Sequence, residues 1–137
     1  MSRPQAREFA LNLLFQYEFD RDFELGTSSA RFIQNFGVPS EVAEYGKPLI
    51  SGILQNLTEI DSAIQAASAH WKIARMSTVD RNALRIGAFE LLYMNQEVPP
   101  KVAINEAIEI GKRFGNAESG GFINGLLDQV ARSKGLI

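Results

Sequence analysis

A polar, glycine-rich stretch, GNAESGG, comes close to the spacing of a nucleotide-binding glycine loop. Such a loop needs a lysine and then a serine or threonine after its last glycine, because an ammonium must reach the phosphates and a hydroxyl must reach magnesium. Here Gly121 and Phe122 stand at those two positions. The segment before the stretch also has helical rather than strand periodicity. We therefore expect a plain helix connection, in which Gly115 forms a left-handed cap and Ser119 opens the next helix.

Side chains that could act in catalysis are few and poorly placed. His70 is the single histidine, and no glutamate stands three residues before it, as a di-iron helical site would require. Glu106 and Glu109 share a predicted helix, but Glu109 precedes Lys112 and Arg113 at the spacing of ordinary helix ion pairs. The chain has no cysteine, which excludes thiolate metal sites and disulfides. We expect no enzyme activity, no metal and no cofactor.

Length and composition set the class of protein. The chain has 137 residues with 45% hydrophobic content, enough for one sizeable core, so we expect a single domain over residues 1–137. No apolar run has membrane-spanning length, and the start lacks the apolar core of a signal peptide. The absence of cysteine fits a reducing cytosol, so we expect a cytoplasmic protein. A net charge of −2 means that any binding of nucleic acid must depend on a local patch or on a partner.

The apolar periodicity is helical along almost the whole chain, and it predicts an all-α fold of about seven helices. The pattern TEID and the pattern STVD each have the form of a helix start. Pro48 is expected to kink or divide the helix that contains it. The helix near Val79–Met94 is apolar almost all the way round, which predicts a central, buried position. The predicted helices cover residues 4–18, 29–36, 40–55, a segment beginning near 58, 79–94, 101–114 and 119–132.

Charge is unevenly distributed. Acidic residues gather in the segment EFDRDFE at residues 18–24, while Arg3 and Arg7 make the N-terminal helix positive. The segment from position 72 to position 85 contains one acidic residue, Asp80, and four basic residues: Lys72, Arg75, Arg81 and Arg85. Because modest basic patches are usually solvated faces, this distribution alone favours nucleic-acid binding only weakly.

Three segments resemble the NusB family of bacterial transcription antitermination factors: AREFALNLLFQYEF, VDRNALRIGAFELLY and VPPKVAINEAIEIGKRFGNAESGGFINGLLDQV. The resemblance implies an all-helical fold of two small packed helix bundles. It implies binding to the boxA element of nascent ribosomal RNA transcripts, together with NusE, a protein that also serves in the small ribosomal subunit. The resulting complex would help RNA polymerase to read through terminators, with no catalysis and no cofactor.

The same resemblance implies an RNA-binding face. By position, Arg3 and Arg7 would contact phosphates, and Glu118 and Phe122 would lie on the matching loop and helix start. An aromatic ring can stack an unpaired base, but the spacing of Phe122 also suits core packing, and both interpretations stand at this stage. Family members often have a richer N-terminal arginine cluster and a lysine where this chain has Gly121. We therefore expect weak RNA binding by the chain alone and a need for NusE.

Two further positions match family contacts with NusE, namely Phe15 and Asp80. An aromatic anchor beside a charge is a plausible interface pair. Core packing is the alternative for Phe15, and a helix-start charge is the alternative for Asp80. Gly125 is expected to allow close helix packing.

Two other functions remain open from the sequence. One is an RNA-binding module of the kind found ahead of ribosomal RNA cytosine methyltransferases, which we would expect to continue into a catalytic domain unless the chain is a fragment. The other is a helical adaptor, in the form of a homodimer, whose main role is protein–protein interaction and whose basic patch is incidental.

Overall fold

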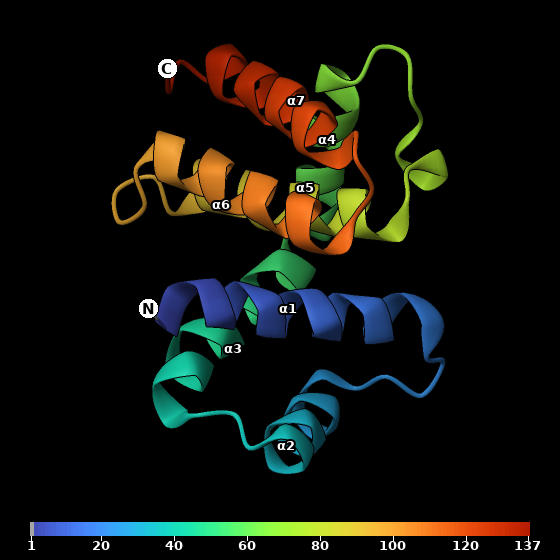
Figure 1. The fold of residues 1–137 in the computed structure, drawn as a ribbon, viewed down its shortest axis with the longest axis vertical. Helices are drawn as coiled ribbons and strands as arrows, with labels where there is room; N and C mark the ends of the chain where they lie inside the picture. The colour runs from blue at the N-terminus through green and yellow to red at the C-terminus, as the bar shows by residue number, and fades with distance from the viewer. Residues whose placement is uncertain (1) are drawn as a thin grey trace. The chain divides into compact units, whose positions relative to one another are not determined.

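The computed structural model describes residues 2–137, and every regular element among them is a helix, as the sequence predicts (Figure 1). These residues divide into two compact units, the first ending at Gln55 and the second beginning at Asn56. Each unit is described by itself. The single domain predicted over residues 1–137 stays a prediction, which one cooperative unfolding transition would confirm. No helix within residues 2–137 is long and apolar enough to cross a membrane.

The first unit contains α1 (Ser2–Phe19), α2 (Leu25–Phe36) and α3 (Ser40–Gln55). α1 packs mainly along α3, and α2 makes a smaller contact with α3. α1 buries an apolar stripe that starts at Ala6 and runs to Leu14, while Tyr17 near its end is 42% exposed. Pro48 does not divide its helix, because α3 continues through it to Gln55. The core of this unit consists of Ala6, Phe9, Ala10, Leu11, Leu13, Leu14, Val42, Leu49, Ile50 and Ile53.

The acidic segment before α2 has a structural role that the sequence did not reveal. α2 begins at Leu25, four residues earlier than expected, because the Glu24 carboxylate accepts a hydrogen bond from the Thr27 amide at 2.8 Å. This backbone hydrogen bond lowers the pKa of the Glu24 carboxyl. At the other end Gly37, with φ of 61°, closes α2 in the left-handed conformation that glycine adopts without strain.

The second unit contains α4 (Leu57–Ala67), a 3₁₀ turn η1 (Ile73–Arg75), α5 (Thr78–Tyr93), α6 (Pro100–Phe114) and α7 (Ser119–Ser133). α5 packs against α4, α6 and α7, which confirms its predicted central position. A Cβ on Gly87 would lie 2.5 Å from the Leu127 side chain and 3.1 Å from that of Ala107, so this glycine allows α6 and α7 to approach α5 closely.

The two predicted helix starts in this unit differ in outcome. Ser77 caps α5, since its hydroxyl accepts a hydrogen bond from the Asp80 amide at 3.2 Å, as the STVD pattern predicts. The TEID pattern, by contrast, lies inside α4, which begins at Leu57 after Asn56. The start predicted at Thr58 was therefore wrong by one residue, and Asn56 makes no side-chain cap.

Candidate nucleic-acid interface

A cavity of about 210 Å³ lies in the second unit, at the start of α5 and beside the connection between α6 and α7. Three residues singled out from the sequence meet here, namely Asp80, Glu118 and Phe122. The full lining is Trp71, Arg75, Met76, Ser77, Asp80, Asn116, Glu118 and Phe122. Two aromatic rings, one guanidinium and two carboxylates thus share one hollow.

Asp80 is the most unusual member of this lining. It is the third residue of α5 and only 8% exposed. Its Oδ1 atom is buried, and no donor within residues 2–137 lies within hydrogen-bonding distance of it. A buried carboxylate oxygen without a donor is costly, because water has been lost and nothing has replaced it. Asp80 therefore combines a helix-start position with an unpartnered, occluded carboxylate oxygen.

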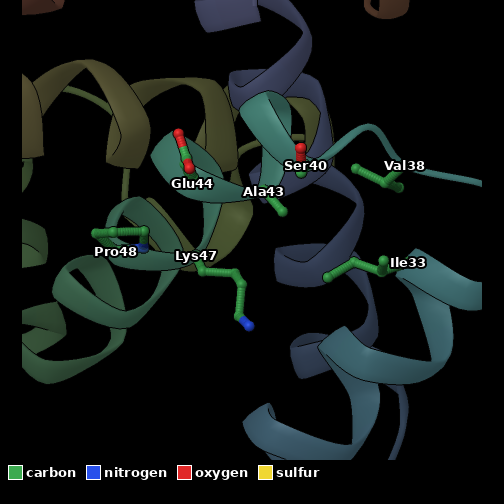
Figure 2. A pocket seen from close by; sticks show the side chains of 7 residues that line it. All are labelled: Ile33, Val38, Ser40, Ala43, Glu44, Lys47 and Pro48. Carbon is green, nitrogen blue, oxygen red and sulfur yellow. The ribbon is translucent and has the colours of Figure 1, made fainter.

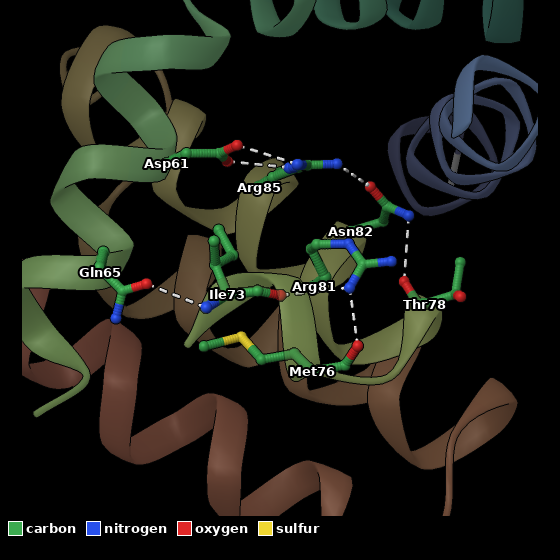
Figure 3. Close-up of polar contacts among 8 residues, drawn as sticks. All are labelled: Asp61, Gln65, Ile73, Met76, Thr78, Arg81, Asn82 and Arg85. Carbon is green, nitrogen blue, oxygen red and sulfur yellow. Dashed lines mark hydrogen bonds and ion pairs between the residues drawn. The ribbon is translucent and has the colours of Figure 1, made fainter. Parts of the chain in front are cut away.

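Trp71 lies on an ordered segment that follows α4. The Trp71 carbonyl accepts hydrogen bonds from the Ser68 hydroxyl at 2.7 Å and from Gln65 Nε2 at 3.0 Å. The Gln65 side-chain oxygen also accepts from the Ile73 amide at 2.9 Å, as Figure 3 shows. The backbone is thus held by α4 while the Trp71 side chain stays largely in solvent, with the residue 58% exposed. A held, exposed indole is suited to stacking at a low entropic cost.

Two of the four basic residues between positions 72 and 85, Arg81 and Arg85, make contacts within the second unit. Arg81 donates to the carbonyls of Ile73 at 3.2 Å and Met76 at 2.7 Å, and so fastens the turn before α5 (Figure 3). Arg85 pairs with Asp61 of α4. The basic patch seen in the sequence is therefore reduced to the two exposed residues that precede α5, Lys72 and Arg75.

The connection between α6 and α7 forms the other wall of the cavity. Its turn is closed by side chains, since the Asn116 amide donates to the Ser119 hydroxyl at 3.0 Å and the Glu118 amide donates to Asn116 Oδ1 at 2.9 Å. Glu118 is exposed at the start of α7. Phe122 is half-buried and lies outside the core, whereas its neighbour Ile123 is fully buried. Phe122 therefore lines the cavity and is not part of the buried core.

Two glycine predictions for this region were wrong. Gly115 has φ of −101° and an extended backbone, not a left-handed one. It is needed for space instead, because a Cβ there would collide with the Ser119 hydroxyl and lie 2.7 Å from the Gly111 carbonyl oxygen. Gly125 does not serve close helix packing, since a Cβ there would meet nothing within 4 Å.

The other predicted residues lie in the first unit. Arg3 is exposed, with its guanidinium 4.7 Å from the centre of the Tyr45 ring. Arg7 is only 3% exposed, and its guanidinium is 5.8 Å from the same ring. Phe15 is half-buried on α1. The structure therefore brings Arg3 and Arg7 together at Tyr45, and the roles predicted for all three residues stay predictions.

Five residues of the cavity were not predicted as site residues; the three that offer an aromatic or polar side chain beyond the cap of α5 are Trp71, Arg75 and Asn116, and the other two are Met76 and Ser77. The adjacent pairing of an aromatic residue with a basic run was the available indication for the first two. Asn116 gave none, because its contribution depends on the turn that it closes.

Comparison with known proteins gives one consistent family. The NusB family model matches residues 4–132. The transcription antitermination protein NusB of Bdellovibrio bacteriovorus is 46% identical over 132 residues, which cover 96% of each chain. The solved structure of T. maritima NusB has 38% identity and a TM-score of 0.86, covering 95% of this chain and 90% of that chain. A crystal structure of antitermination factors NusB and NusE in complex with dsRNA has 26% identity and a TM-score of 0.85, covering 96% of this chain and 97% of that chain.

The fold defines an all-helical protein, and the site adds an aromatic, charged cavity at the start of its central helix. Within that class, the chain belongs to the NusB family.

Proposed function

We propose that this chain is a transcription antitermination factor of the cytoplasm, without enzymatic activity, that binds boxA RNA of nascent ribosomal RNA transcripts jointly with NusE. Membership of the NusB family supports the role, and the similarity to NusB in a structure with NusE and dsRNA supports the partners. The observation that carries the proposal for this chain is the cavity in which Trp71 and Phe122 lie with Arg75. Aromatic rings that stack unpaired bases, beside a guanidinium for the backbone, are what RNA recognition requires.

Within this proposal, Arg3 supplies a phosphate contact from the N-terminal helix, and Glu118 and Phe122 form the wall of the RNA site. Phe15 contributes to the surface for NusE. Asp80, the second position expected to face NusE, has only 8% of its surface exposed and shares the cavity of Phe122.

The proposal is tested by titrating labelled boxA RNA and a scrambled RNA with the protein, alone and with NusE. We expect weak binding by the protein alone, because the chain is net negative and has few N-terminal arginines. NusE should raise the affinity for boxA, and linkage requires boxA to raise the affinity for NusE by the same factor. Equal binding of both RNAs in the presence of NusE would contradict the proposal.

A second candidate is a helical adaptor, and an apolar hollow in the first unit favours it. This groove has a volume of about 570 Å³ and lies between α2 and α3. Figure 2 shows Ile33 of α2 on one side and Ala43 and Pro48 of α3 on the other. Light scattering separates the candidates, since a homodimeric adaptor would have twice the monomer mass and would lose it on Ala43→Glu.

A further inference from the structure

The ring of Tyr45 on α3 contacts two guanidinium groups of α1. The Arg3 Cζ atom lies 4.7 Å from the ring centre, and the Arg7 Cζ atom lies 5.8 Å from it. The negative face of an aromatic ring attracts a cation at distances up to about 6 Å. Arg3 and Arg7 stand four residues apart on one helix, where like charges repel each other. The Tyr45 ring thus offsets this repulsion and gathers both charges at one place.

The two arginines differ in what they can offer to a ligand. Arg7 is only 3% exposed, so its guanidinium is shielded from a large partner. Arg3 is exposed, and its side chain makes no ion pair or hydrogen bond among residues 2–137. A guanidinium that lies over a ring uses its flat face, while its N–H donors stay at the edge. Arg3 is therefore held in place with its donors available for a phosphate.

The support of Arg3 differs in kind from that of two other arginines. Carboxylates hold Arg85 and Arg132, through Asp61 and Asp128, and they occupy guanidinium donors and balance the charge. A ring fixes the side chain without neutralising it. An aromatic support therefore suits an arginine that must still meet an anion, whereas a carboxylate support suits an arginine that joins parts of the fold.

We propose that Tyr45 is a positioning residue for RNA binding, whose ring holds the Arg3 guanidinium ready for a phosphate of the RNA. The inference rests on the proposed RNA-binding function and adds a residue that acts through Arg3. A mobile arginine loses rotamer freedom when it binds, which weakens affinity about twofold to tenfold. The ring removes part of this cost in advance. The gain matters in a chain whose N-terminal helix has only two basic residues, Arg3 and Arg7.

The test is a double-mutant cycle of Tyr45→Leu and Arg3→Ala. Leucine keeps an apolar side chain at position 45 but offers no ring face to the guanidinium. Binding of boxA RNA and of scrambled RNA, each with NusE, is measured at several salt concentrations. We expect Arg3→Ala to weaken both RNAs about tenfold and Tyr45→Leu to weaken both about threefold to fivefold. In the Arg3→Ala background Tyr45→Leu should cost nothing further, because the ring acts on RNA only through Arg3.

Three further variants make the result specific to the ring. Tyr45→Phe keeps the ring and should bind both RNAs as the wild type does. Trifluorophenylalanine at position 45 has almost the same shape but a less negative face, so it should reproduce the loss, and it covers the case in which Tyr45→Leu is unfolded. Tyr93→Leu is the matched control, since the Tyr93 ring is 42% exposed and stacks on Phe89. It should leave the affinity for both RNAs unchanged.

Additive losses from Arg3→Ala and Tyr45→Leu would overturn the inference while leaving the RNA-binding function intact. A folded Tyr45→Leu with a lowered melting temperature and wild-type RNA affinity would also overturn it, and would make Tyr45 a contact between α1 and α3 alone. Tyr45→Phe that binds as weakly as Tyr45→Leu would assign the effect to the hydroxyl and sink the role of the ring. If the wild type with NusE does not prefer boxA to scrambled RNA, the proposed function fails, and the inference fails with it.

Discussion

Arg85 of α5 and Asp61 of α4 form a two-point ion pair, with Nε 2.9 Å from Oδ1 and Nη2 2.9 Å from Oδ2. The Arg85 side chain is 9% exposed and that of Asp61 is 25% exposed, so the pair is largely removed from water. The remaining guanidinium nitrogen of Arg85, Nη1, donates to Asn82 at 3.0 Å (Figure 3). The pair thus joins two helices of the second unit through charge-assisted hydrogen bonds.

Breaking this pair should cost stability. We expect Arg85→Ala to lower the free energy of unfolding by about 3 kcal/mol, because it leaves the Asp61 carboxylate largely buried without its cation. Arg132 pairs with Asp128 at 2.8 Å on α7, but those side chains are 62% and 41% exposed. Arg132→Ala should therefore cost less than about 1 kcal/mol. Denaturant unfolding measures both, and equal small losses would show that the Arg85 pair contributes no more than a surface pair.

Gly115 and Gly121 should respond oppositely to alanine. We expect Gly115→Ala to destabilise the fold by about 1–3 kcal/mol, because the new methyl group would collide with the Ser119 hydroxyl. Gly121 lies exposed in α7, where an added methyl group would meet nothing within 4 Å, so Gly121→Ala should be neutral or stabilise by up to about 1 kcal/mol. Thermal melting compares the two variants. A harmless Gly115→Ala would mean that the turn relaxes easily.

Phe122 and Ile123 allow the RNA site and the core to be tested side by side. We expect Phe122→Ala to weaken RNA binding by roughly 1–3 kcal/mol, as loss of a stacking ring should. It should leave NusE binding without RNA unchanged. Ile123 is fully buried, so Ile123→Ala should instead lower the free energy of unfolding by about 2–5 kcal/mol. If Phe122→Ala instead unfolds the chain and the folded fraction keeps its RNA affinity, then Phe122 is a core residue and not a stacking ring.

Alanine substitutions of Arg3 and Arg7 should differ in their effect on stability. Arg3 is exposed, and Arg3→Ala should reduce the salt slope of RNA binding by about one phosphate contact, for boxA and scrambled RNA alike. The same loss was predicted for Arg7, but this side chain is 3% exposed, so we expect Arg7→Ala to lower the melting temperature as well. Titrations at several salt concentrations beside thermal melts measure both effects. An unchanged slope for Arg3→Ala would remove it from the RNA face.

Local patterns in the sequence predicted local structure well. The central helix α5 and its Ser77 cap follow from apolar spacing and from a four-residue motif, so no distant contact is needed to find them. The Gly115 prediction was wrong because the constraint on that residue is spatial, and it comes from Ser119 across the turn. Pro48 does not divide its helix, since α3 runs through it to Gln55, while the predicted kink stays a prediction.

The cavity was only partly predictable. The resemblance indicated Glu118 and Phe122, but nothing in the spacing places them beside Asp80 and Trp71, because that proximity requires the packing of α5 against α7. The basic residues between positions 72 and 85 were equally ambiguous in sequence. Arg85 finds its partner 24 residues away, at a distance along the chain that no short motif reports.

Trp71 is the single tryptophan of the chain, and it lines the cavity on a segment whose backbone is held by Gln65 and Ser68. Its indole emission is therefore an intrinsic optical reporter of this one hollow. A base stacked on the ring would quench that emission, while an RNA that touches only the N-terminal helix would leave it unchanged. Occupancy of the cavity can thus be followed in the unmodified protein, without any label on the RNA, and compared with total binding.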